Sequence, residues 1–150
     1  MDEPFQLTSP AFTDGGAIPE RYTGRGENIS PPLHIQGTPE GTDNLALIMH
    51  DPDAPNSDYL HWALWGISPD VTDVGEDQVP SGALQGTNSN GTAAYIGPLP
   101  PSGTHRYIFD LYALDAPLDL AEGAARADVM NAVGQHRIVH ASLTGTVSAR

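Results

Sequence analysis

The chain has 150 residues, of which 19 are acidic and 6 are basic, and its formal net charge is -13. All of the basic residues are arginine, so the chain should repel polyanions, and nucleic acid is excluded as a partner. Cysteine is absent, which excludes disulfides, thiolate metal sites and a cysteine nucleophile.

The composition shows no break and no linker run, so we expect one domain over residues 1–150. The N-terminal residues are acidic, and no apolar stretch approaches the length of a membrane span. We therefore expect a soluble, cytoplasmic protein without membrane insertion. An acidic surface without lysine is also typical of proteins that work in concentrated salt. A halophilic origin is our hypothesis, and an ordinary acidic protein of a GC-rich genome is the alternative.

Short apolar runs between turn signals predict strands, in chain order, at residues 5–8, 33–36, 45–49, 62–67, 92–96, 107–114 and 139–147. The last run alternates apolar and polar residues, as in a sheet with one wet face. One helix is predicted over residues 124–134, where Ala125, Val129 and Val133 are spaced by four and Gly134 is placed to end it. With 16 glycines and 14 prolines, the pattern favours a mostly β domain, a β-sandwich with long shaped loops.

Three segments indicate a binding pocket: residues 51–55, the His61-Trp62 pair, and residues 97–107. Proline fixes φ and glycine frees it, so the proline- and glycine-containing segments are predicted to be loops that deliver polar side chains to one place. Side chains alternate along a strand, so His105 and Tyr107 should face inward together while Arg106 points away.

The aspartates of the first segment, Asp51 and Asp53, follow the strand at 45–49, and the intervening prolines should keep them out of its ladder. His61 begins the next strand, so we expect it to lie beside them at the end of the sheet. His50 alternates in direction with Asp51 and is a weaker candidate. The structural alternatives are turn formation for the aspartates and a hydrogen-bonded core position for the histidines.

An aspartate beside a histidine favours the charged imidazole and fixes which ring nitrogen faces outward. Such a histidine can donate to an anion, and Tyr107 adds a hydroxyl donor. A turn containing Gly97 could also point backbone N–H groups inward, so that phosphate or carboxylate would be held without lysine.

At these positions the sequence resembles the phosphatidylethanolamine-binding protein family, also called the Raf kinase inhibitor-like family, in its short bacterial and archaeal form. The resemblance covers nearly the whole chain, including residues 18–23, 26–33, 85–88 and 141–146. It implies a sandwich of two antiparallel sheets with Greek-key connections and a cavity for phosphate-like anions. By motif position, the family's pocket residues fall on Asp51, Asp53, His61, Gly97, Pro98, His105 and Tyr107.

Two positions differ from the family's usual pattern. Ile96 stands where microbial members commonly have glycine, which should narrow the mouth of the cavity, and Val147 stands where they commonly have tyrosine. The chain also lacks the longer C-terminal helix of animal members, so their kinase-inhibitory role is not carried over.

The leading prediction is a binding module for a small anionic or phosphorylated ligand, with no cofactor and no metal. One alternative is an enzyme in which His50, Asp51, Asp53, His61 and His105 hold a metal ion or act as acids and bases. Another is a module that docks a phosphorylated segment of a partner protein. Exposed sheet edges would also permit a homodimer.

Overall fold

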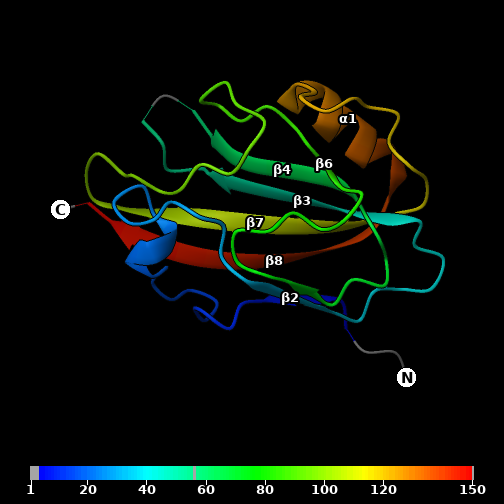
Figure 1. Cartoon of the computed structure of the whole chain (residues 1–150), viewed down its shortest axis with the longest axis horizontal. Helices are drawn as coiled ribbons and strands as arrows, with labels where there is room; N and C mark the ends of the chain where they lie inside the picture. The colour runs from blue at the N-terminus through cyan, green and yellow to red at the C-terminus, as the bar shows by residue number, and fades with distance from the viewer. Residues whose placement is uncertain (1–3, 56, 150) are drawn as a thin grey trace.

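The computed structural model describes residues 4–55 and 57–149 as two antiparallel sheets and one α-helix. The larger sheet has the strand order β6-β4-β3-β7-β8, and the smaller sheet has the order β1-β2-β5. In Figure 1 the helix α1 lies on one side of the larger sheet, and the smaller sheet lies on the other. The predicted fold class, mostly β with one short helix near the C-terminus, is confirmed.

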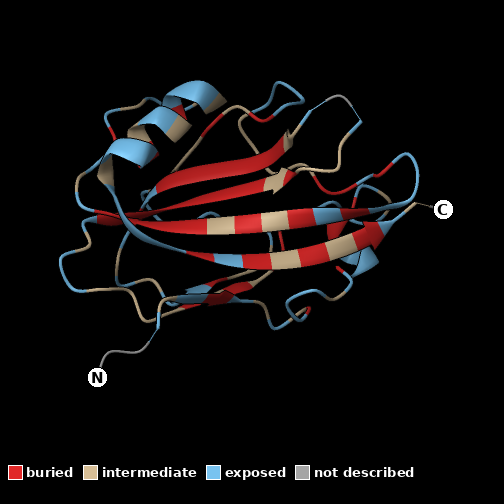
Figure 2. Ribbon diagram, turned by 180° about the vertical axis from the view of Figure 1, so that it is seen from behind, coloured by how far each residue is buried: buried red, intermediate tan, exposed pale blue. Residues whose placement is uncertain are grey.

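The five strands of the larger sheet are β3 (Asn44–Asp51), β4 (Tyr59–Ile67), β6 (Leu84–Gln85), β7 (Thr104–Leu114) and β8 (Arg137–Ser148). Strand β3 is central and buried on both faces, because one face packs under the smaller sheet and the other under α1. Figure 2 shows β3 and β4 as nearly continuous buried ribbons, whereas β7 and β8 alternate between buried and more exposed residues. The sheet therefore separates two packed layers.

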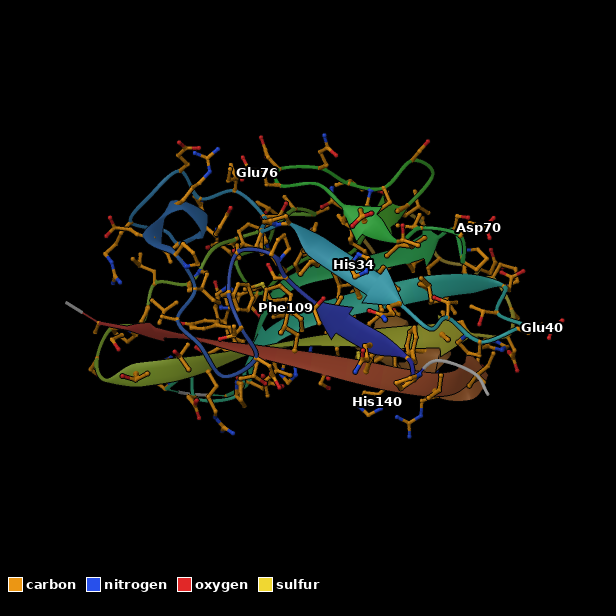
Figure 3. The ribbon with its side chains drawn as sticks, turned by 90° about the horizontal axis from the view of Figure 1, so that it is seen from below. His34, Glu40, Asp70, Glu76, Phe109 and His140 are labelled. Carbon is orange, nitrogen blue, oxygen red and sulfur yellow. The ribbon has the colours of Figure 1, made fainter. Side chains whose placement is uncertain are left out.

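The smaller sheet consists of β1 (Gln6–Thr8), β2 (Leu33–Gln36) and β5 (Asp73–Val74). Its buried residues Leu7, Ile35 and Val74 belong to the same core as Leu47 and Phe109 of the larger sheet. Figure 3 looks at this sheet from below, with Phe109 in the interior and Glu40, Asp70 and Glu76 at the periphery. A short 3-10 helix, η1 (Glu20–Tyr22), adds the buried ring of Tyr22 to this core.

The helix α1 covers Arg126–His136 and packs Val129 and Val133 against the larger sheet. The predicted helix existed, but its end was wrong. Gly134 lies inside the helix without a left-handed φ, and the chain passes from His136 directly into β8. Tertiary packing of the valines and the adjoining strand sets the helix end, and the glycine does not.

The strand predicted at residues 92–96 is absent from the described strands. Its backbone is held instead by Asn88, whose side chain donates to Thr92 and Ala94 and accepts from the Thr92 N–H. The strands predicted at 45–49 and 62–67 are longer than expected, while β5 and β6 were missed because two residues carry no periodicity. Val139 was expected to face the core, but 39% of it is exposed.

Within the part of the chain that the structure describes, no helix is both long enough and apolar enough to cross a bilayer.

Candidate functional site

A cavity of about 350 Å³ opens at the end of the larger sheet where β3, β4 and β7 meet the 96–101 loop. It is lined by Asp51, Ala54, Pro55, Tyr59, His61, Asn90, Ile96, Gly97, Leu99, Pro100, Pro101, His105 and Tyr107. Apart from Asn90, its polar side chains come from the strands, while the apolar ones come from the loops. The three segments singled out in the sequence do converge.

The hairpin of β3 and β4 places the first pair of polar residues. Asp51 pairs in register with Tyr59 on the neighbouring strand β4. His61 follows Tyr59 by two residues on the same strand, so it lies close to the carboxyl of Asp51. The sequence placed Asp51 beyond the strand, but it is the last residue of β3, because the first proline of the motif follows it. Strand β7 then brings His105 and Tyr107 to the same end of the sheet.

His105 and Asp51 form a buried pair, with 2.6 Å between Nδ1 and Oδ2. The other oxygen of Asp51 accepts the backbone N–H of Asp53 at 2.8 Å. An ionised carboxylate only accepts, so Nδ1 of His105 carries a hydrogen and Nε2 is the ring nitrogen left for a ligand. Among the described residues, Nε2 of His105 has no hydrogen-bond partner.

His61 is fixed by a different partner. Its Nδ1 lies 2.7 Å from the carbonyl oxygen of Ile96, which can only accept, so this nitrogen also carries a hydrogen. Burial lowers the pKa of His61, although the Ile96 carbonyl works in the opposite direction. The ring is therefore neutral at neutral pH and presents a lone pair on Nε2, which has no partner within the described chain.

The tyrosines enclose the two imidazoles. The ring of Tyr107 meets His61 edge to face at 5.2 Å and lies nearly parallel to His105 at 6.4 Å between centroids. Burial raises the pKa of Tyr107, and the negative charge of Asp51 adds to the effect, so its hydroxyl remains a donor. Tyr59 packs on the other side of His61 at 4.9 Å.

Gly97 lines the cavity, but its backbone N–H does not face a ligand. It donates to the side chain of Asn28 at 2.7 Å, so the expectation of an inward-pointing N–H at this glycine is wrong. A Cβ at this position would lie 2.6 Å from the carbonyl oxygen of Tyr22. The glycine is thus required by close packing of two loops.

Two residues predicted for the pocket, Asp53 and Pro98, are not among those that line it. Asp53 accepts from the backbone and guanidinium of Arg106, at 2.9 to 3.0 Å, and this hydrogen bonding lowers the pKa of Asp53 to about 2. Arg106 is exposed and faces away from the cavity, as its strand parity predicted. Pro98 is buried and accepts the N–H of Gly24, which anchors the 96–101 loop.

The sequence did not identify Tyr59 or Asn90 as lining residues, whereas the wall formed by Ile96, Leu99, Pro100 and Pro101 falls in or next to the segment that it had marked. Tyr59 was detectable, since it shares a strand face with His61 two residues later. Asn90 arrives from a distant loop and had no signal. The side chains of Trp62 and Trp65 fill the two cores and do not line the cavity.

The geometry supports a metal-dependent enzyme less well than a binding site. Over residues 4–55 and 57–149, no three histidine, aspartate or glutamate side chains are grouped to hold a metal ion. His50 lies on the opposite face of the sheet, bonded to Asp58 and Asp110. A larger groove of about 670 Å³ lies between residues 37–40 and the start of β8, but none of the predicted site residues lines it.

The chain is similar to several known proteins. Residues 8–148 match the model of the phosphatidylethanolamine-binding protein family. A UPF0098 protein of Methanothermobacter thermautotrophicus is 49% identical over 144 residues, covering 93% of this chain and 95% of that protein. The candidate lipoprotein LppC of Mycobacterium tuberculosis is 40% identical, covering 96% of this chain and 72% of LppC.

Solved structures agree with the sequence relatives. The phosphatidylethanolamine-binding protein homologue CT736 of Chlamydia trachomatis superposes with a TM-score of 0.93 at 38% identity, covering 97% of this chain and 98% of that one. E. coli YbcL, described as a member of the mammalian PEBP family, gives a TM-score of 0.92 at 31% identity, covering 99% of this chain and all of YbcL. This chain belongs to the phosphatidylethanolamine-binding protein family.

Proposed function

We propose that this protein binds a small phosphorylated ligand, with the phosphate group seated between His61, His105 and Tyr107. The observation that supports this most strongly is the buried Asp51–His105 pair at 2.6 Å, at the polar end of a cavity of about 350 Å³. Family membership supports ligand binding in general, and the polar atoms of this cavity favour a phosphate.

Each polar atom has a distinct part in this proposal. The hydroxyl of Tyr107 donates to a phosphate oxygen, and Nε2 of His105 donates when its ring is charged, with Asp51 holding the ring in place. His61 presents a lone pair and accepts from a protonated phosphate oxygen. Asp53 and Pro98 contribute by fixing the loops around the cavity.

The apolar mouth of the cavity favours an organic phosphate over the inorganic ion. Leu99 is 61% exposed at this mouth, beside Ala54, Ile96 and Pro101. An exposed apolar rim around a polar end fits a phosphomonoester whose organic part remains at the entrance.

Isothermal titration with inorganic phosphate and phosphoethanolamine, at a salt concentration where the protein is folded, tests the proposal. Both should bind, and Tyr107→Phe, which removes only the hydroxyl, should weaken binding about threefold to tenfold. His34→Gln is the matched control, because His34 is a partly exposed histidine on the smaller sheet, paired with Asp73. No heat with either ligand would refute the proposal.

The cytoplasmic location and the homodimer stay predictions. Cell fractionation tests the first, and the relative named as a candidate lipoprotein makes that measurement informative. Sedimentation tests the second.

A further inference from the structure

A second cluster of charged side chains lies on the face of the larger sheet that carries α1, away from the cavity. At its centre is the partly buried imidazole of His50, near the end of β3. Its Nδ1 lies 2.8 Å from Oδ1 of Asp58, and its Nε2 lies 3.1 Å from Oδ2 of Asp110. Both ring nitrogens therefore face carboxylate oxygens.

This geometry requires an imidazolium. A neutral imidazole carries one hydrogen, so one nitrogen would direct its lone pair at an oxygen that only accepts. The hydrogen bond to Asp110 raises the pKa of His50; burial opposes this, and Asp58 adds to the increase. Burial disfavours ionisation of Asp110 too, but bonds from His50 and Ser142 outweigh it and lower the pKa of Asp110.

Each carboxylate is tied to a further element. Asp58 accepts from the guanidinium of Arg126 at 2.7 Å, and its backbone carbonyl accepts from the same arginine at 2.8 Å, which joins it to the first turn of α1. Hydrogen bonds from His50 and Arg126 outweigh burial and lower the pKa of Asp58. Asp110 accepts from Ser142 and lies 3.9 Å from Nε2 of His140, both on β8.

The cluster and the cavity share the end of one hairpin. His50 adjoins Asp51 in β3, and Asp58 adjoins Tyr59 in β4, and these two neighbours pair in register and line the cavity. A shift in the pairing register lies between Met49 and His50, so the ladder itself is irregular at this point. The side-chain bonds of His50 to Asp58 and Asp110 lie next to that irregularity. The positive charge of His50 in turn contributes to the lowered pKa of His61 on β4.

We propose that His50 is a positioning residue: its imidazolium bridges Asp58 and Asp110 and holds Asp51 and Tyr59 in the ligand-binding arrangement, so that loss of its proton loosens the pocket. The expected effect of His50 on ligand affinity rests on the proposed function. Its expected effect on the order of the hairpin rests on the charged cluster alone.

The pH window follows from the directions of the shifts. His50 has a folded pKa above its ordinary value of about 6.5, so its contribution is complete below that value and is lost as pH rises through the folded pKa. Asp58 and Asp110 have lowered pKa values, so their contribution is complete above about 4 and is lost only in stronger acid. The bridge from His50 to Asp58 and Asp110 is therefore intact in mildly acidic solution and is lost in alkaline solution.

The experiment measures amide exchange at residues 50–51 and 59–61 in the ligand-free protein across pH, corrected for intrinsic rates, together with the NMR titration of His50. Protection should fall as His50 loses its proton, by about threefold to tenfold. In His50→Gln it should be low at every pH, while His34→Gln keeps the wild-type profile. Should His50→Gln fail to fold, Asp110→Asn and the wild-type pH profile carry the same test.

Phosphate titration supplies the second readout. The ratio of wild-type to His50→Gln affinity should be about threefold to tenfold in mild acid and approach one in alkali, with the ionisation of phosphate cancelling in the ratio. The inference is overturned if amide protection at these residues stays constant while His50 titrates. It is also overturned if the affinity ratio stays constant over the same pH range. If phosphate does not bind at any pH, the proposed function is refuted instead. The amide-exchange measurement alone then decides whether His50 is a positioning residue.

Discussion

Asp51 shows how one side chain satisfies two interpretations that the sequence kept apart. Its Oδ1 accepts the N–H of Asp53, as in an ordinary aspartate turn, while its Oδ2 holds His105 in the cavity. A carboxylate has enough lone pairs for both bonds. Turn formation is therefore the means by which the pocket histidine is oriented, and a motif that predicts a turn does not argue against a site.

The lone pair that His61 presents on Nε2 predicts selectivity for phosphate over sulfate. His61 presents a lone pair, which a protonated phosphate oxygen satisfies and fully ionised sulfate cannot. Titration calorimetry at neutral pH should show phosphate binding about tenfold tighter or more. Burial lowers the pKa of His61, so the ring stays neutral until the pH falls below the pKa of an ordinary histidine. The preference for phosphate over sulfate should fade only below that pH. Equal affinity for the two anions at neutral pH would contradict the assignment of His61 as an acceptor.

Close packing at Gly97 predicts that Gly97→Ala destabilises the fold. The new Cβ would lie 2.6 Å from both Oδ1 of Asn28 and the carbonyl oxygen of Tyr22, and backbone cannot move aside as a side chain can. We expect a loss of about 1 to 3 kcal/mol in the free energy of unfolding, measured by urea denaturation. An unchanged midpoint would show that the two loops can separate.

At the scale of elements, the sequence correctly predicted which face of a strand each side chain occupies, because side chains alternate along a strand. The faces of His105, Arg106 and Tyr107 follow from the period of two along a strand, and the structure places them so. Loops have no such rule. The wall at residues 96–101 depends on bonds to Asn28 and Gly24, residues roughly 70 positions earlier in the chain, and no local pattern predicts them.

The misassigned end of α1 provides a prediction for the helix. Gly134 lies within the helix, with no left-handed φ and with open space where a Cβ would be. Gly134→Ala should therefore stabilise the protein by about 0.5 to 1 kcal/mol, since alanine loses less backbone entropy on folding. Thermal unfolding followed by circular dichroism measures this gain in stability. The expected effect is opposite in sign to that of Gly97→Ala. A lowered melting temperature would mean that Gly134 does act in ending the helix.

For the whole molecule, the larger sheet with both faces covered explains what the sequence could and could not predict. Every residue of β3 except His50 is buried, so the strand has no polar face, and alternation alone could not say which face meets α1. The pocket and the His50 cluster lie back to back across this strand. Sequence reasoning found the first because turns mark it. The second has no comparable signal, since Asp58, Asp110 and Arg126 are far apart along the chain.

The net charge of -13 on 150 residues predicts that the fold depends on salt. Like charges on a compact body repel, and screening shortens that repulsion as the Debye length falls from about 10 Å at 0.1 M to about 3 Å at 1 M. The exposed ion pairs of Arg21 with Glu27 and Glu76 are weakened by the same screening, but surface pairs contribute little. The melting temperature should therefore rise over a potassium chloride series, by more than it rises in sucrose, which adds no screening. A melting temperature that is flat or falling with salt would show that repulsion among these carboxylates does not limit stability, and the acidic surface would then need a different physical explanation.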